Sequence, residues 1–330
     1  MGTVLLDFEK PLAEMEAQIE KLRGLAEGQN LEIQDDLRQL ELKLERMRTE
    51  VFSRLTPWQR VQLARHLGRP NSLDYVAALC DEQMELAGDR NFRDDPGMVT
   101  GLGLAAGTPL VWMGHQKGGS DVKENVRRNF GMSHPEGYRK ALRMFEMANR
   151  FRLPTVAFVD TPGAYPGIGS EERGISEAIA RNLREMLRVR APFVVVITGE
   201  GGSGGALGIA VADVVLVLEY AFYSVISPEG CASILWSDSS KAAVAAEALK
   251  FTSGDLVDLR VVDEVIPEPP GGAHRDPALM KARVREAVLR HVARLRAIPP
   301  EELVRRRREK YLAIGVTGED PAALTPAEKP

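Results

Sequence analysis

One stretch of this chain decides the fold: Ile197-Thr198-Gly199-Glu200-Gly201-Gly202-Ser203-Gly204-Gly205-Ala206-Leu207-Gly208. It follows a continuous apolar run, residues 193–197, that is typical of a strand buried on both faces. We expect it to open a short helix of small residues that runs to about Ala212. Glycine lets a backbone approach a ligand closely, and the first amides of a helix have no partner within it. The stretch therefore predicts a strand-to-helix turn that can hold a negative charge.

Three motifs overlap on this glycine stretch. Gly199, Gly201 and Gly204 fit the G-x-G-x-x-G pattern of dinucleotide-binding domains, and Glu219 follows at about the spacing of the ribose ligand. Ser203 lies at the centre of a G-x-S-x-G pattern, the nucleophile elbow of serine hydrolases. The third interpretation is an oxyanion hole made of backbone amides. The segment by itself leaves all three open.

Composition narrows the class of protein. A chain of 330 residues with a formal net charge of −4 has no overall attraction to nucleic acid. We find no apolar run of membrane-spanning length and no secretory signal, so we expect a cytoplasmic protein without a membrane partner. The two cysteines, Cys80 and Cys231, are too few for a zinc cluster or a disulfide framework, and we expect no metal on this chain.

The pattern of apolar residues changes along the chain. Residues 8–51 are highly charged and predict two helices separated at residues 24–30, as an antiparallel hairpin or a partner-binding arm. Thr56 and Pro57 predict a helix start, and residues 72–87 an amphipathic segment. Further on we expect strands at residues 98–106, 110–113, 154–159, 193–197 and 214–218, with helices at 135–150 and 171–188. This alternation predicts an α/β core of helices around a sheet.

A second glycine loop precedes the first one. Residues 160–167, Asp-Thr-Pro-Gly-Ala-Tyr-Pro-Gly, also stand between an apolar strand and a predicted helix. When two such loops meet, amides from separate elements can form an oxyanion hole.

Several long runs in order resemble the α subunit of bacterial acetyl-coenzyme A carboxylase carboxyltransferase. They are residues 114–118, 160–174, 199–206, 223–232 and 267–275. The resemblance spans nearly the whole chain. It implies a crotonase-like spiral of ββα units, with a helical region at residues 1–96, the carboxyltransferase core at 97–276, and C-terminal helices with a flexible tail at 277–330.

The resemblance also implies a reaction and its partners. In that family a carboxyl group moves from carboxybiotin, on a biotin carboxyl carrier protein charged by a biotin carboxylase, to acetyl-CoA. The product is malonyl-CoA, in the first committed step of fatty acid biosynthesis. The α subunit works with a β subunit, which usually bears zinc and mainly binds the CoA thioester, as an α2β2 heterotetramer.

The same resemblance suggests which backbone groups act. We expect the amides of Gly204 and Gly205 to stabilise the oxyanion of biotin, with Gly163 and Ala164 forming the opposing wall. The alternatives are structural: Gly204 and Gly205 can serve close helix–strand packing, and Gly163 and Gly167 can serve turns with positive φ beside prolines.

Side chains near the loops are further candidates. Arg173 is expected to contact a substrate carboxylate or a CoA phosphate, or else to pair with Glu177. Lys117 and His115 are expected to steer a phosphate or the carrier domain, or else to be solvated loop residues. Ser203 is expected to line the substrate site through its backbone geometry and not to act as a nucleophile.

Two other functions remain open. A free-standing crotonase-like acyl-CoA hydratase or isomerase needs a positioned pair of carboxyl groups, and Glu200 and Asp160 are the acids at the two loops. A non-catalytic assembly subunit would instead use the N-terminal helices. The four arginines 305–308 predict a basic helix face paired with acidic neighbours.

Overall fold

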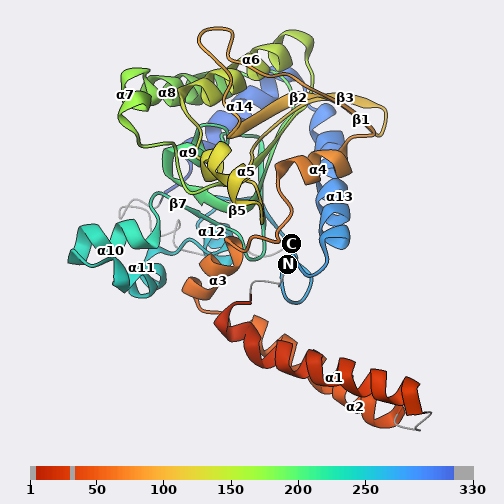
Figure 1. The fold of residues 1–330 in the computed structure, drawn as a ribbon. Helices are drawn as coiled ribbons and strands as arrows, with labels where there is room; N and C mark the ends of the chain where they lie inside the picture. The colour runs from red at the N-terminus through yellow and green to blue at the C-terminus, as the bar shows by residue number, and fades with distance from the viewer. Residues whose placement is uncertain (1–4, 30–33, 316–330) are drawn as a thin grey trace.

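The computed structural model describes residues 5–29 and 34–315, and within these ranges the strands form one eight-stranded sheet in the order β1-β2-β3-β4-β5-β6-β8, with β7 paired to β5 (Figure 1). The strands are β1 (Glu82–Glu85), β2 (Met98–Ala105), β3 (Thr108–His115), β4 (Thr155–Thr161), β5 (Phe193–Gly202), β6 (Val214–Leu218), β7 (Phe222–Ser224) and β8 (Glu264–Ile266). The helices, with 3-10 helices marked η, are η1 (Asp7–Glu9), α1 (Lys10–Gln29), α2 (Gln34–Ser53), α3 (Pro57–Ala64), α4 (Ser72–Leu79), α5 (Val122–Arg127), η2 (Asn129–Gly131), α6 (Pro135–Phe151), α7 (Ile168–Glu172), α8 (Ile175–Met186), α9 (Ser203–Leu207), α10 (Pro228–Trp236), η3 (Ser239–Lys241), α11 (Ala242–Leu249), α12 (Ser253–Asp258), α13 (Pro277–Arg296) and α14 (Pro300–Leu312).

The sheet changes from antiparallel to parallel at β3. β1, β2 and β3 are antiparallel neighbours, and β4, β5, β6 and β8 then run parallel to β3. β4, β5 and β6 are buried along their whole length, which explains their unbroken apolar runs. The strands predicted at residues 98–106 and 110–113 are confirmed as β2 and β3, which are joined at Ala106-Gly107, where both residues have positive φ as a tight hairpin requires.

Helices cover the sheet and form the core with it. α6 packs against β2, β3 and α8, whereas α13 packs against α4 and β5. In Figure 1 α6, α7 and α8 lie together at the top of the view and α13 runs along the right-hand side. The predicted α/β core is therefore confirmed. None of the helices in the described part of the chain is long and apolar enough to cross a membrane.

The N-terminal helices form the expected hairpin. α1 and α2 lie side by side and project from the body of the protein (Figure 1). Their shared apolar stripe, which includes Leu12, Ile19 and Leu44, continues at the base of the arm onto Leu63 and Tyr220. The predicted break at residues 24–30 is wrong at its start, since α1 continues through Gly24 to Gln29. A glycine costs an exposed helix only about 1 kcal/mol, which packing against α2 offsets.

Three segments differ from the bounds that the sequence suggested. The segment 72–87 is helical only to Leu79, because residues 82–85 leave the helix to form the edge strand β1, whose side chains are all exposed. The segment 171–188 divides into α7 and α8 at Gly174, where φ is +77°. The helix expected to reach Ala212 ends at Leu207, and a side chain on the next residue, Gly208, would lie 2.7 Å from the Tyr138 ring.

The C-terminal arginines are only partly a surface feature. Arg305 and Arg306 pair with Glu302 at the surface, as predicted. Arg307 is instead buried, where its guanidinium pairs with Asp213 and donates hydrogen bonds to backbone carbonyls of residues 186, 189 and 191. This contact fixes α14 against the segments that flank β5 and β6.

Candidate active site

The two glycine loops meet through their backbones. A Cβ added to Gly205 would lie 2.3 Å from the carbonyl carbon of Gly163 and 2.4 Å from the amide nitrogen of Ala164. A Cβ on Gly202 would lie 2.1 Å from the carbonyl oxygen of Pro162. The structure thus brings together the residues predicted to face each other, and leaves no room for side chains between the loops.

An irregularity in the sheet creates this meeting point. β4 and β5 pair in register up to Val159 and Ile197, and the register then shifts so that Thr161 pairs with Gly201. Asp160 therefore stands opposite residues 198–200, and its Oδ1 accepts a hydrogen bond of 2.9 Å from the Glu200 amide. The carboxylate replaces ladder hydrogen bonds that the bulge removes. The bulge thus lies where β4 and β5 pass into the two glycine loops.

Hydrogen bonds fix both loops. The Thr161 hydroxyl donates to the carbonyl of Gly163 and accepts from its amide. The carbonyl of Gly205 accepts a hydrogen bond of 3.1 Å from the Tyr138 hydroxyl. Gly167 has φ −73°, so the positive φ suggested for it is wrong; it lies instead where a Cβ would be 2.4 Å from the Tyr165 ring.

Ser203 forms the sharp turn from β5 into α9. It has φ +53°, which is uncommon outside glycine, and its side chain is exposed. Within the part of the chain that the structure describes, no histidine hydrogen-bonds to Ser203, although a nucleophile elbow needs such a base. The geometry supports the backbone interpretation: the turn presents the amides of Gly204 and Gly205, which have no acceptor within α9.

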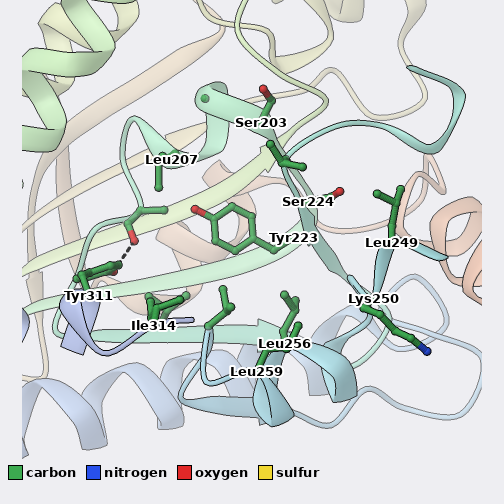
Figure 2. A pocket seen from close by; sticks show the side chains of 15 residues that line it. Ser203, Leu207, Tyr223, Ser224, Leu249, Lys250, Leu256, Leu259, Tyr311 and Ile314 are labelled. Atoms are coloured by element: carbon green, nitrogen blue, oxygen red, sulfur yellow. Dashed lines mark hydrogen bonds between the residues drawn. The ribbon is translucent and has the colours of Figure 1, made fainter. Parts of the chain in front are cut away.

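A pocket of about 420 Å³ opens beside α9 (Figure 2). Ser203, Gly204 and Leu207 line it from α9, and Tyr223 lies across from them. Its other lining residues are mostly apolar: Ala210, Val215, Ser224, Val225, Leu249, Lys250, Leu256, Leu259, Val261, Tyr311 and Ile314. Burial raises the pKa of the Tyr223 hydroxyl, which stays protonated at neutral pH. The pocket suits an apolar group with a polar end near Ser203 and Gly204.

Lys117 lies in a cluster of charges and is not a solvated loop residue. Its Nζ is 2.7 Å from Asp160 Oδ1 and 3.0 Å from Glu200 Oε2. The other oxygen of Glu200 accepts a hydrogen bond of 2.6 Å from Arg65 Nε, and Arg65 also pairs with Glu229. The sequence did not suggest this role for Arg65, because it lies 135 positions from Glu200 and no local pattern links them.

His115 ends β3 and is fully buried, so the interpretations that it steers a ligand or is solvated are both wrong. Neither ring nitrogen has a hydrogen-bond partner among the described residues. Burial, with a smaller contribution from the nearby Lys117 ammonium, lowers the pKa of His115 to about 3. The imidazole is therefore neutral at physiological pH.

This buried histidine predicts an acid-sensitive fold. Below about pH 6.5 the unfolded chain binds a proton at His115, whereas the folded chain binds it only near pH 3. The free energy of unfolding therefore falls as the pH falls through that window. We expect the loss from this residue to be about 2 kcal/mol at pH 5. Urea unfolding at pH 7 and pH 5 measures it, with His115→Leu as the reference that lacks the titrating group. Equal losses for both proteins would contradict the prediction.

Arg173 is held by a neighbouring helix. Its Nε lies 2.7 Å from Glu136 Oε1 and its Nη2 lies 3.2 Å from Glu136 Oε2, so the suggested pair with Glu177 is replaced by a two-point pair with α6. The guanidinium also lies over the Phe92 ring, 5.4 Å from its centre. Contact between Arg173 and a substrate stays a prediction.

One group of residues has the composition of a metal site. Glu9, His66 and His274 lie together at the base of the N-terminal arm, with Glu9 Oε1 3.5 Å from His274 Nε2. His66 Nδ1 also accepts a hydrogen bond of 3.1 Å from the Gly68 amide. Arg275, 3.5 Å from Glu9 Oε1, also supplies countercharge. These contacts link η1, at the start of the arm, to His274 and Arg275.

Comparison with solved structures defines the class of fold. The chain aligns with the Pseudomonas malonate decarboxylase MdcD-MdcE heterodimer at a TM-score of 0.55 and 17% identity, over 76% of this chain and 94% of that one. It aligns with the transcarboxylase 12S at a TM-score of 0.54 and 20% identity, over 68% of this chain and 42% of that one. The chain shares the fold of these two enzymes, which agrees with the fold that the family resemblance implied.

Sequence comparison identifies the family. The family model described as acetyl co-enzyme A carboxylase carboxyltransferase-like matches residues 5–315, and the chain belongs to this family. The acetyl-coenzyme A carboxylase carboxyl transferase subunit alpha of Geobacter metallireducens is 56% identical over 306 residues, which cover 93% of this chain and 96% of that protein. The subunit of the same name from Thermus thermophilus is 51% identical over 314 residues, covering 95% and 99%.

Proposed function

We propose that this chain is the α subunit of an acetyl-CoA carboxylase carboxyltransferase and provides the biotin side of its active site. The observation that carries the proposal is the backbone contact between Gly205 and the Gly163–Ala164 loop in a member of this family. The substrates would be carboxybiotin on a separate carrier protein and acetyl-CoA.

The glycine loops suit this chemistry. Transfer breaks the bond between the biotin nitrogen and the carboxyl carbon, joins that carbon to the methyl carbon of acetyl-CoA, and passes the methyl proton to the biotin nitrogen. Negative charge on the ureido oxygen needs hydrogen-bond donors that are already in place. The amides of Gly204 and Gly205 at the start of α9 would supply them, while Gly163 and Ala164 shape the opposite wall. Because biotin accepts the proton, the protein need not supply a base.

The acids near the loops are engaged elsewhere, which speaks against a hydratase or isomerase. Asp160 and Glu200 both pair with Lys117, and Glu200 also pairs with Arg65. Burial raises the pKa of Glu200, but Lys117 and then Arg65 outweigh it and hold the pKa below its usual value. A carboxylate in this state is a poor general acid.

The remaining expectations complete the proposal. A β subunit would contribute the CoA side, and a biotin carboxyl carrier protein and a biotin carboxylase would supply the carboxyl group, in the cytoplasm and with α2β2 stoichiometry. Ser203 and Arg173 are proposed to line the substrate site. The core would span residues 97–276, between the helical region 1–96 and the segment 277–330.

The reverse half-reaction tests the function. Decarboxylation of malonyl-CoA onto free biocytin would be measured with this chain alone, with the matching β subunit alone, and with the two co-purified. We expect activity only in the co-purified complex. Activity of this chain alone would support the free-standing enzyme, and a complex that transfers no carboxyl group would support the assembly subunit.

A further inference from the structure

Three charged side chains lie at the point where the two glycine loops diverge from the sheet. Lys117 follows β3, Asp160 lies near the end of β4, and Glu200 lies in the glycine stretch of β5. Their side chains are 16%, 9% and 6% exposed. Charges this enclosed are costly unless they compensate one another, so the cluster needs an explanation.

The cluster is built around a single oxygen atom. Asp160 Oδ1 accepts hydrogen bonds from Lys117 Nζ at 2.7 Å and from the Glu200 amide at 2.9 Å. A Cβ on Gly199 would lie 2.5 Å from this oxygen, so the glycine stretch wraps closely around the carboxylate. The bulge that separates Val159 from Thr161 in the pairing register is therefore filled by the Asp160 side chain.

We propose that Lys117 is a positioning residue for the oxyanion hole, acting through Asp160 and Glu200. The inference rests on the proposed function. The ammonium joins the Asp160 carboxylate, which fills the bulge, to the Glu200 carboxylate on the opposite strand of the same bulge. It thereby fixes how Gly163 and Ala164 stand against Gly204 and Gly205. In this role Lys117 acts on the two loops and not on the substrate.

Electrostatics explains why a cation is needed there. Without Lys117, the carboxylates of Asp160 and Glu200 would repel each other within the bulge, and the pair from Arg65 reaches only the other oxygen of Glu200. Burial lowers the pKa of the Lys117 ammonium, but Asp160 and Glu200 outweigh burial and raise it. Lys117 thus stays charged at neutral pH, and its contacts with both carboxylates hold the bulge in one geometry.

Positioning and substrate binding make different kinetic predictions. Loss of an interaction used equally by substrate and transition state raises KM, whereas misalignment of groups that act only in the transition state lowers kcat. A misplacement of about 1 Å can reduce the rate about 10²-fold. Lys117→Met is therefore expected to lower kcat about 10²-fold and to change KM for malonyl-CoA and biocytin less than about threefold.

The matched control is Lys140→Met. Lys140 is also buried, with its Nζ 2.6 Å from Asp94 Oδ1 and 2.8 Å from the Asp95 carbonyl, and it makes no hydrogen bond or ion pair to either glycine loop in the described structure. Each variant would be co-purified with the β subunit and assayed for malonyl-CoA decarboxylation onto biocytin, with Tm measured on the same samples. We expect both variants to lose thermal stability and only Lys117→Met to lose kcat.

A second pair of variants covers the case in which Lys117→Met does not fold. Asp160→Asn keeps an oxygen that can accept from the Glu200 amide, and Asp160→Ala does not. Positioning predicts a kcat at least about tenfold higher for Asp160→Asn than for Asp160→Ala. The proposal is overturned if KM rises with kcat unchanged, if Lys140→Met loses as much kcat as Lys117→Met, or if the two Asp160 variants have equal kcat. An inactive wild-type complex would instead refute the proposed function.

Discussion

Replacement of Gly205 by alanine is expected to lower kcat of the co-purified carboxyltransferase about 10³-fold. The new Cβ would lie 2.3 Å from the Gly163 carbonyl carbon and 2.4 Å from the Ala164 nitrogen, which is far inside contact distance. These are backbone atoms and cannot rotate away, so the loops must separate. Loss of a single oxyanion-hole donor costs about 10²–10³ in kcat, and separation would displace both walls.

The neighbouring glycine provides the control for this effect. A Cβ on Gly204 would meet only Ile179 Cδ1, at 3.8 Å, which is an ordinary contact. Gly204→Ala keeps the amide and should retain activity within about tenfold of the wild type, with an unchanged Tm. Malonyl-CoA decarboxylation kinetics and thermal unfolding would be measured on the Gly204→Ala and Gly205→Ala complexes to test this difference. Wild-type kcat in Gly205→Ala would show that the contact between the loops is not needed for catalysis.

Replacement of Arg69 by methionine is expected to lower the free energy of unfolding by about 3–5 kcal/mol. Arg69 pairs at two points with Glu268, with distances of 2.8 Å and 2.7 Å, and also donates to the carbonyl of Thr198 in the bulge. The side chains of Arg69 and Glu268 are 4% and 0% exposed. Removal of the cation leaves a buried carboxylate whose remaining partners are the amides of Tyr220 and Ala273.

A double variant distinguishes the loss of the ion pair from the cost of an unpaired buried carboxylate. Arg69→Met with Glu268→Gln leaves no uncompensated carboxylate, so it should lose less stability than Arg69→Met alone. Urea unfolding at pH 7 measures both. A loss below about 1 kcal/mol in the single variant would contradict the prediction, since that is the range of exposed ion pairs.

The backbone part of the site could be predicted from sequence, whereas its side-chain part could not. The need for glycine at a position depends on the backbone of a few neighbouring residues. Two glycine loops that follow neighbouring parallel strands also lie at the same edge of a sheet, which is why Gly205 was expected to face Gly163. The partners of Lys117 and Arg173 come from other elements. Glu136 is 37 positions from Arg173, and Glu200 is 83 positions from Lys117. Periodicity reports only a residue's own helix or strand.

The ends of helices also differ in whether they could be predicted from neighbouring residues. α3 begins where Thr56 and Pro57 predicted, because capping is an interaction between near neighbours: the Thr56 hydroxyl accepts from the Gln59 amide. α4 ends before its amphipathic pattern does, because the next residues pair with β2 as an exposed edge strand that carries no apolar signal.

By itself the sequence determined the α/β core, the helical arm and the two glycine loops, because strand burial, capping and glycine geometry act over a few residues. The family followed from the resemblance of its long motifs. Only the tertiary structure decided that His115 is buried and neutral, that Arg307 is a core residue, and that Lys117 is held between Asp160 and Glu200. A charge acquires its partners and its dielectric environment from segments that fold against it. Neither is encoded near it along the chain.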